Sequence, residues 1–267
     1  MSALASSLPP RFKVLSAGIS AITLEACVTK ILAMVERREK GYVNVCTVHT
    51  MLECVDRPQV AEIVNHSTLS VPDGMPLVWL GKHNAEGVSV DRCYGPDLML
   101  GVCRSGLEKG VRHGLYGATP AVLEVLEQNL RGMFPRIEIV CAISPPFREL
   151  SADEEREMAS KINAAHPDVV WVGLGTPKQD LCLGAFRPIL EAPVLIAVGA
   201  AFNFHAGKVA QAPRWMMRCG LEWAFRLLKE PRRLWRRYLL GNPRFVSLLL
   251  LQRYKEWRAI RGARCEH

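Results

Sequence analysis

The chain has 267 residues, of which 49% are hydrophobic and 22% are charged, and its formal net charge is +8. These values are typical of a globular protein with a substantial core, organised as one large domain or as a domain with an appendage. Nine cysteines stand at irregular spacings without a C-x-x-C pair, which argues against a zinc ribbon, a thioredoxin-type site and a disulfide framework. The N-terminal residues lack the basic-then-apolar order of a signal peptide, so we expect a cytoplasmic protein.

Short apolar runs alternate with helical patterns through the first 200 residues. In chain order the patterns predict strand 14–19, helix 23–39, strand 42–47, a helical stretch to 63, strand 69–71, helix 95–110, strand 113–117, helix 120–133, strand 137–143, helix 151–166, strand 169–175, a helix from 177, and strand 194–200. Strands this apolar are buried on both faces, as in a parallel sheet. We therefore predict an α/β fold with a doubly wound, mostly parallel, Rossmann-like sheet.

The pattern changes near residue 207, so we expect an α/β catalytic core at 1–206 and a basic helical C-terminal appendage at 207–267. Between 226 and 264 the chain has twelve Lys and Arg against two Glu, a local charge of +10, so the rest of the chain sums to about −2. We expect the helices of this tail to break at Pro231 and Pro243. Its longest apolar run, FVSLLLL, is far too short to span a bilayer.

Two interpretations of this basic tail remain open. Its helices, in which Arg and Trp alternate with Leu, are of the kind that lie on a membrane surface. They could equally pack on the core and leave a basic face in solvent. In either case the charge asymmetry favours an anionic partner, which could be membrane lipid, a diphosphate or nucleic acid.

The loops after the strands are the candidate site, because ligands of doubly wound sheets bind beyond the carboxyl ends of the strands. Asp73 is the only carboxylate at a predicted strand end beside a tight glycine turn. A base in this place could deprotonate an acceptor hydroxyl, although Asp-Gly also occurs simply as a turn or an N-cap. His49 could donate to a sugar or could be a satisfied core histidine. We interpret Trp171 and Trp215 as packing residues.

The loop Gly173–Gln179 resembles a phosphate-holding loop, because its glycines let the backbone approach and a helix opens at Pro177. It does not match G-x-G-x-x-G and lacks the downstream acidic residue of a dinucleotide site, so close packing at a helix start explains it equally well. No D-x-D triplet occurs, so the carboxylate pair that holds a divalent metal in many sugar-nucleotide enzymes is missing. We expect no metal and no cofactor, with cations of the tail neutralising a departing diphosphate.

Seven short motifs follow one another along residues 42–240. They are Thr47-Val48-His49, Val71-Pro72-Asp73-Gly74, Arg92 with Gly95-Pro96-Asp97-Leu98, Leu115-Tyr116-Gly117, Gly173-Leu174-Gly175-Thr176-Pro177-Lys178-Gln179, Ala212-Pro213-Arg214-Trp215, and Gly220-Leu221-Glu222-Trp223 with Arg226 and Glu230-Pro231-Arg232-Arg233. In this order they resemble the WecG/TagA/CpsF family, glycosyltransferase family 26.

The resemblance implies an inverting, metal-independent transfer of a hexose-type sugar from a UDP-sugar to an undecaprenyl-diphosphate-linked saccharide, in cell-surface or exopolysaccharide biosynthesis. It implies Asp73 as the catalytic base. The residues that it implies in substrate binding are Thr47, His49, Arg92, Gly117, Gly175, Thr176, Gln179, Arg214, Arg226, Arg233, Arg236 and Arg237. The implied partners are the UDP-sugar, the lipid-linked acceptor and the anionic inner face of the cell membrane, with no nucleic acid.

The chain departs from the family pattern at three positions. His49 stands where the family usually has asparagine, Asp180 where it has glutamate, and Gln211 where it has arginine. Position 49 is expected to contact a sugar, so this departure bears on the identity of the donor or acceptor, which the sequence leaves open along with the pathway and the oligomeric state.

Two other classes of protein compete with this reading. A nicotinamide or S-adenosylmethionine enzyme is weakened by the missing dinucleotide fingerprint. A nucleic-acid-binding protein is suggested by the isoelectric point near 9.1, but the basic residues are confined to a Leu-rich tail without a recognised binding module.

Overall fold

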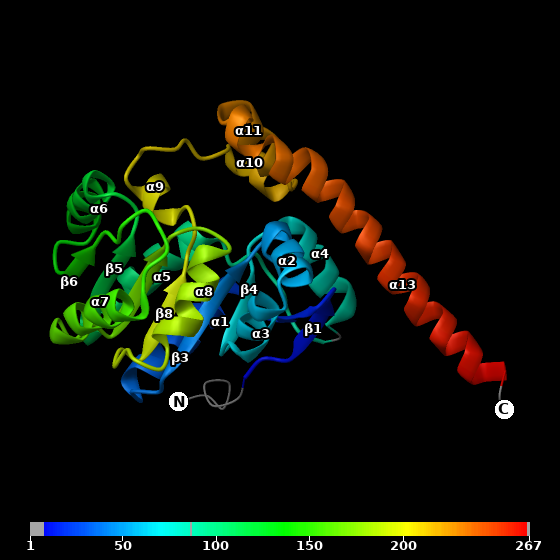
Figure 1. The fold of residues 1–267 in the computed structure, drawn as a ribbon, viewed down its shortest axis with the longest axis horizontal. Coiled ribbons are helices and arrows are strands. Elements are labelled where there is room, and N and C mark those ends of the chain that lie inside the picture. Colours follow the sequence, from blue (N-terminus) through cyan, green and yellow to red (C-terminus); the bar gives the residue numbers. More distant parts are fainter. Residues whose placement is uncertain (1–7, 86, 266–267) are drawn as a thin grey trace.

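The computed structural model describes residues 8–85 and 87–265. A six-stranded parallel sheet with the order β4-β3-β8-β7-β5-β6 forms its centre (Figure 1). The strands are β3 (Gly41–Cys46), β4 (Leu69–Pro72), β5 (Arg112–Gly117), β6 (Glu138–Ile143), β7 (Val169–Gly173) and β8 (Val194–Ala197). All residues of β3 and β8 are buried, as their apolar sequences predict. The predicted doubly wound α/β fold is confirmed.

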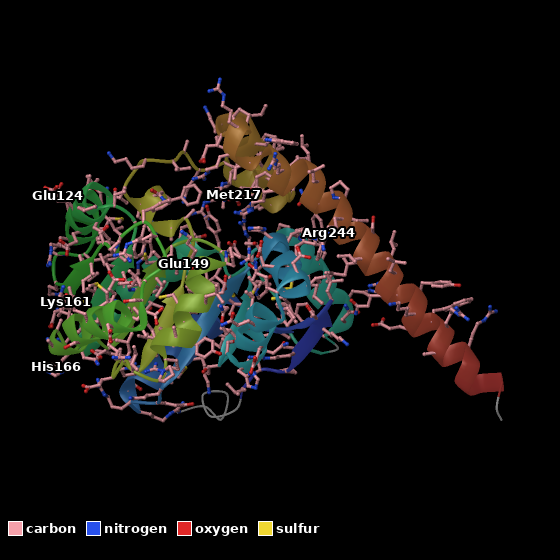
Figure 2. All side chains as sticks on the ribbon, viewed as in Figure 1. Glu124, Glu149, Lys161, His166, Met217 and Arg244 are labelled. Carbon is pink, nitrogen blue, oxygen red and sulfur yellow. The ribbon has the colours of Figure 1, made fainter. Side chains whose placement is uncertain are left out.

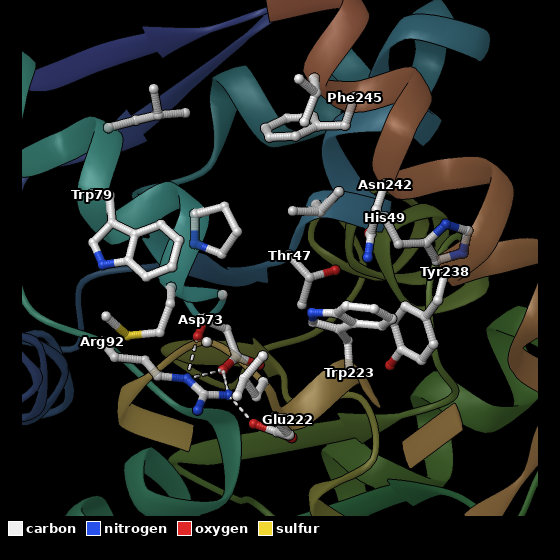
Figure 3. A pocket seen from close by; sticks show the side chains of 18 of the residues that line it. Thr47, His49, Asp73, Trp79, Arg92, Glu222, Trp223, Tyr238, Asn242 and Phe245 are labelled. Carbon is white, nitrogen blue, oxygen red and sulfur yellow. Dashed lines mark hydrogen bonds and ion pairs between the residues drawn. The ribbon is translucent and has the colours of Figure 1, made fainter. Parts of the chain in front are cut away.

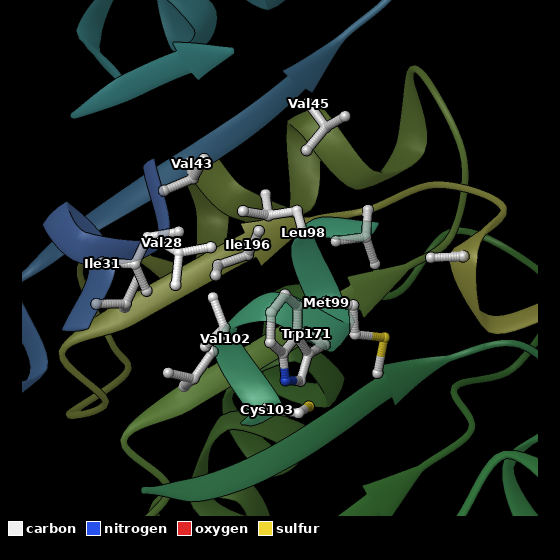
Figure 4. Close-up of a cluster of buried hydrophobic side chains, with 14 of the residues drawn as sticks. Val28, Ile31, Val43, Val45, Leu98, Met99, Val102, Cys103, Trp171 and Ile196 are labelled. Carbon is white, nitrogen blue, oxygen red and sulfur yellow. The ribbon is translucent and has the colours of Figure 1, made fainter. Parts of the chain in front are cut away.

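Helices cover both faces of this sheet. One face packs against α1 (Leu24–Glu36), α5 (Gly95–Gly106) with the 3₁₀ turn Leu107–Lys109, and α6 (Pro120–Met133). The other packs against α7 (Ala152–Ala164) and α8 (Lys178–Phe186). Figure 4 shows the first face, where Met99 and Val102 of α5 surround Trp171 of β7. Trp171 is fully buried, which confirms its predicted packing role, whereas Trp215 is 62% exposed and that prediction was wrong.

A third group of elements lies beside the β4 edge. It comprises β1 (Arg11–Val14), β2 (Ala17–Ser20), α2 (Val48–Asp56), α3 (Pro58–His66) and α4 (Met75–Asn84). The single strand predicted at 14–19 is wrong, because the chain turns at Leu15, whose φ is 54°, and β1 and β2 pair as an antiparallel hairpin. The helical stretch predicted to 63 is two helices that meet at Arg57, just before Pro58.

The C-terminal segment returns over the carboxyl ends of the strands. It comprises α9 (Ala201–His205), α10 (Arg214–Arg218), α11 (Glu222–Lys229), α12 (Pro231–Trp235), a π turn (Arg236–Leu240) and α13 (Gly241–Cys265). The predicted break before Pro231 is confirmed, since Glu230 has non-helical dihedral angles. The break predicted at Pro243 is wrong. The wider π turn ends at Leu240, in the turn of helix before this proline, where the missing N–H and the ring would disturb a regular α-helical ladder.

Two contacts hold the first part of α13 on the core. Phe245 is 3% exposed within the cluster formed by the hairpin, α2 and α4, and Arg244 pairs with Asp56 of α2 over 2.7 Å (Figure 2). Further along, Gln252 Oε1 accepts from the Leu15 N–H over 2.9 Å, and beyond Gln252 α13 extends away from the core (Figure 1). Within the described residues, no helix is both long and apolar enough to cross a membrane.

Candidate functional site

A cavity of about 640 Å³ lies between the strand-end loops of the core and the C-terminal segment (Figure 3). Its core side is formed by the first turn of α2, the turn after β4, and α4. Its other side is formed by residues 217–226 and by inward-facing side chains of the π turn and α13. The predicted residues Thr47, His49, Asp73, Arg92, Arg226 and Arg237 all line this one cavity.

Backbone hydrogen bonds hold Asp73 at the floor of the cavity. The Asp73 N–H donates to the Cys46 carbonyl over 2.8 Å, so the turn after β4 is fastened to the end of β3, directly before Thr47. The Cys93 N–H donates to the Pro72 carbonyl over 2.8 Å, which brings Arg92 beside Asp73. Two loops far apart in sequence are therefore fixed around one carboxylate.

Arg92 bridges two carboxylates from opposite sides of the cavity. Its Nη2 donates to Asp73 Oδ1 over 2.9 Å and to Glu222 Oε2 over 2.6 Å, and its Nε lies 3.1 Å from Asp73 Oδ1. Nε also donates to the Asp73 carbonyl. Within the described residues Asp73 Oδ2 accepts no hydrogen bond. One oxygen of Asp73 is thus held in place while the other is free to receive a proton.

The surroundings of Asp73 make it a stronger base than an ordinary aspartate. Burial raises the pKa of Asp73 to about 6, with Arg92 opposing the rise and Glu222 adding to it. Burial alone would lower the pKa of Arg92, but Asp73 and Glu222 outweigh this and raise it. At neutral pH the carboxyl is therefore ionised and yet close to the pKa that suits a general base.

The N-terminus of α2 contributes a partial positive charge to the same cavity. Thr47 is the N-cap, and a capping box pairs it with Thr50. His49 lies in the first turn. Burial, and then the nearby Arg237, lower the pKa of His49 to about 4, while a hydrogen bond with the Thr176 backbone opposes the shift. His49 is therefore a neutral imidazole at physiological pH, able to donate or accept a hydrogen bond.

Arg226 and Arg237 give the cavity an unbalanced positive charge. Each guanidinium has a buried Nε without a hydrogen-bond partner, and in the described part of the chain neither forms an ion pair with a carboxylate. They lie over aromatic rings instead, Arg226 over Phe204 at 5.5 Å and Arg237 over Tyr238 at 5.6 Å. Burial lowers the pKa of Arg237, and the neighbouring Arg226 and Arg233 lower it further. An anionic ligand between these arginines would offset both the cost of burying the guanidiniums and the repulsion between them.

The other predicted core residues do not line the cavity. Gln179 is 2% exposed, and its Oε1 accepts from the Gly175 N–H over 3.1 Å and the Gly199 N–H over 2.9 Å. It therefore positions the loops after β7 and β8. Gly117 has a φ of 131°, and a Cβ there would lie 2.7 Å from the Gly173 backbone, so it permits close approach of β5 and β7. Gly175 faces open space, and Thr176 reaches the site through its backbone contact with His49.

Three of the predicted arginines do not line the cavity. The side chain of Arg214 is 77% exposed and lies 3.6 Å from Asp97. Arg233 pairs with Glu230, and Arg236 lies over the Trp235 ring at 5.2 Å. Arg226 and Arg237 are the two predicted tail arginines that the fold turns inward.

Several lining residues were not predicted from the sequence as site residues. They are Trp79, Glu222, Trp223, Tyr238 and Asn242. Figure 3 shows Tyr238 and Asn242 beside His49, and Trp223 tilted against Tyr238, with ring centroids 6.2 Å apart. Glu222 and Trp223 belong to the Gly-Leu-Glu-Trp motif, so the sequence contained a signal that could have identified them. The others come from helices whose inward face becomes clear only once α13 is docked.

The cavity contains both a carboxylate with a raised pKa and several arginine side chains. This combination can remove a proton from a hydroxyl and stabilise an anionic leaving group in the same space. Within residues 8–85 and 87–265, no three His, Cys, Asp or Glu side chains gather so as to hold a metal ion.

Comparison with known proteins gives one consistent result. The model of the glycosyl transferase WecG/TagA/CpsF family matches residues 12–259, a longer span than the motifs at 42–240. An N-acetylglucosaminyldiphosphoundecaprenol N-acetyl-beta-D-mannosaminyltransferase of Bacillus spizizenii is 30% identical over 198 residues, which are 74% of each chain. A protein of Bacillus subtilis (strain 168) with the same name is 28% identical over 189 residues, 71% of each chain. The chain therefore belongs to the WecG/TagA/CpsF family and is a glycosyltransferase.

Proposed function

We propose that the protein transfers a hexose-type sugar from a UDP-sugar to an undecaprenyl-diphosphate-linked saccharide, with inversion at the anomeric carbon and without a metal ion. The observation that carries this proposal is the position of Asp73, a carboxylate with a raised pKa. It lies in a cavity that also holds two arginines without a carboxylate partner in the described part of the chain. The names of the two relatives support a diphosphate-linked polyprenyl acceptor.

The proposed reaction is a single displacement. Asp73 Oδ2 takes the proton of an acceptor hydroxyl while the hydroxyl oxygen forms a bond to the anomeric carbon. On the opposite face the bond from that carbon to the UDP oxygen breaks, and UDP leaves with the electron pair. Attack from the face opposite the leaving group inverts the configuration. Arg92 holds Asp73 Oδ1 through this step, and the protonated carboxyl then returns its proton to solvent.

The arginines and the α2 N-terminus support a metal-independent mechanism. The substrates contribute two diphosphates, one in the UDP-sugar and one in the acceptor. Arg226 and Arg237 face the cavity without a carboxylate partner in the described chain, and the first turn of α2 adds the positive end of a helix dipole. Fixed cations and N–H groups of this kind can neutralise the charge that develops on a departing diphosphate.

A stripe along α13 supports peripheral binding to the cytoplasmic face of the membrane. Val246, Leu250, Tyr254 and Trp257 recur at helical spacing and are each about half exposed or more. Arg258 lies over the Tyr254 ring at 5.9 Å and Arg261 over the Trp257 ring at 4.4 Å. A stripe of apolar and aromatic residues flanked by arginines suits the interface of an anionic bilayer.

The test of the proposed reaction is UDP release from a panel of UDP-sugars with a synthetic lipid-diphosphate saccharide as acceptor. UDP-N-acetylmannosamine, UDP-glucose and UDP-linked uronic acids form the panel. With the best donor, Asp73→Asn should lower kcat by roughly 10²–10⁴, the usual contribution of a general base. Asp153→Asn, at an exposed side chain far from the cavity, is the matched control. Full activity in a folded Asp73→Asn variant would refute the assignment.

A further inference from the structure

A second cavity continues the first along α4 and α13. It measures about 490 Å³ and lies between β1, the end of α4 and the middle of α13. Leu80, Leu249 and Arg253 line both cavities. The two cavities therefore adjoin each other, and the second, between the core and the C-terminal helix, is called here the α4–α13 groove. From Leu249 to Trp257 it follows roughly 12 Å of α13.

Apolar and polar side chains share the lining of this groove. Its apolar part is formed by Phe12 and Leu80 on the core side and by Leu249 and the ring of Trp257 on α13, and the rest is lined by Lys13, Asn84, Gln252, Arg253 and Glu256. A hydrocarbon chain that packs on the apolar part would remove this surface from water, which is favourable by about 25 cal/mol per Å² of apolar area.

Two of the polar side chains at the groove, Gln252 and Glu256, bind each other, and Gln252 also binds the hairpin. Gln252 accepts from the Leu15 N–H over 2.9 Å through Oε1 and donates to Glu256 Oε1 over 2.9 Å through Nε2. The bond from Leu15 also fastens α13 to the hairpin. Together with the Arg244–Asp56 pair, it holds α13 on the core at two points.

We propose that the α4–α13 groove holds the isoprene units of the acceptor nearest to its diphosphate. This inference rests on the proposed function, since it places the hydrocarbon part of the same lipid-linked acceptor. Its diphosphate would lie at the arginine-rich end, near Arg226 and Arg237, and its saccharide at Asp73. The chain would then run past Leu80 and Leu249 toward Trp257.

The far end of the groove explains how the rest of the chain returns to the bilayer. Trp257 both lines the groove and belongs to the exposed α13 stripe of Val246, Leu250 and Tyr254. A prenyl chain that leaves the groove at Trp257 therefore meets the surface proposed to lie on the membrane. The acceptor would stay partly in the bilayer while its diphosphate is held in the catalytic cavity.

The experiment compares two acceptors with the same saccharide and diphosphate, one on an undecaprenyl chain and one on a single isoprene unit, in detergent micelles. Leu249→Gln alters the groove, and Leu251→Gln alters the opposite side of α13, where Leu251 is 54% exposed. Leu249→Gln should raise KM for the undecaprenyl acceptor about tenfold, a loss of about 1.4 kcal/mol. Because Leu249 also lines the catalytic cavity, the test is the difference: the rise of KM for the undecaprenyl acceptor should exceed any rise for the short acceptor or the UDP-sugar by about fivefold, which corresponds to about 1 kcal/mol.

Two results would refute the proposal that the groove binds isoprene units. One is an equal KM of the wild type for both acceptors, with no effect of Leu249→Gln. The other is an equal rise of KM in the Leu249 and Leu251 variants, which would indicate general contact with lipid. Either result leaves the proposed function intact, because transfer still occurs. Absence of transfer to both acceptors by the wild type would instead count against the proposed function.

A labelling experiment tests the groove independently of turnover and of variant folding. A prenyl diphosphate that carries a benzophenone group on its first isoprene units should label peptides of α4 and α13 in the wild-type protein. An undecaprenyl diphosphate in excess should compete for this labelling. Labelling confined to peptides outside α4, α13 and β1 would overturn the proposal.

Discussion

The Glu222→Gln substitution provides the sharpest test of how the site tunes its base. Glu222 Oε2 lies 2.6 Å and Asp73 Oδ1 2.9 Å from the same Arg92 nitrogen, so these two oxygens are at most 5.5 Å apart. At an effective dielectric constant of about 20, two charges at that separation interact by about 3 kcal/mol, or about two pKa units. Glutamine keeps an amide oxygen for Arg92 while removing the charge.

The direction in which the pH profile should shift depends on which form of Asp73 is active. In the proposed mechanism the ionised carboxylate is the base, so activity should be present above the pKa of Asp73 and fall about tenfold per pH unit below it. In the wild type this fall in activity at low pH, the acid limb of the pH profile, should be centred near pH 6. This is the pKa of Asp73, which burial and Glu222 raise and Arg92 lowers. Without the Glu222 charge the pKa of Asp73 falls, so the limb should move down by about one to two units.

The assay is kcat/KM for the UDP-sugar from about pH 4 to about pH 8, which reports ionisations of the free enzyme. Both phosphates of the UDP-sugar are esterified, so the substrate does not titrate in this range, and His49, with a pKa of about 4, titrates at its lower edge. Glu230→Gln, which removes the partner of Arg233, is the matched control. An acid limb that stays in place or moves up in Glu222→Gln would refute the reasoning.

A substitution at Arg237 and a truncation test the role of the C-terminal segment. Arg237→Ala removes a guanidinium that has no carboxylate partner in the described chain. It should lower kcat/KM about 10- to 100-fold, because a charge-assisted hydrogen bond contributes about 1.5–3 kcal/mol. If Arg237→Lys restores kcat/KM, the positive charge alone suffices. Truncation after Lys229 removes Arg237, Tyr238 and Phe245 from the cavity. It should abolish transfer, while the circular dichroism spectrum of the α/β core persists. Undiminished turnover would show that the segment does not complete the site.

The fold was largely predictable because burial in a parallel sheet leaves a direct signature. Strands such as β7 and β8 are continuous apolar runs with helices between them, and the carboxyl ends of parallel strands meet at one edge. Thr47 and Asp73 could therefore be placed together from their positions alone. The predicted strand at 14–19 failed because Leu15 adopts a positive φ, which is uncommon for a leucine and has no clear sequence signal.

The orientation of the tail arginines was not predictable in the same way. The resemblance implied Arg214, Arg226, Arg233, Arg236 and Arg237 together, whereas in the structure Arg226 and Arg237 line the cavity. Which arginine points inward depends on the rotation of α11 and α13 about their axes, and the π turn at Arg236–Leu240 shifts that rotation in the middle of the segment. The Arg92–Glu222 pair joins residues 130 positions apart, and no local pattern encodes such a contact.

The charge of the C-terminal segment therefore serves the proposed reaction at two places. Arg226 and Arg237 are turned toward Asp73, whereas Arg258 and Arg261 stack on the aromatic rings of the exposed α13 stripe. Because one continuous helical stretch from Pro231 to Cys265 carries both Arg237 and that stripe, a membrane that orients the stripe would also orient the arginine. Docking of the segment completes the cavity with Arg237, Tyr238 and Asn242. Contact with the bilayer and completion of the site would then be coupled, and transfer would be favoured where the lipid acceptor resides.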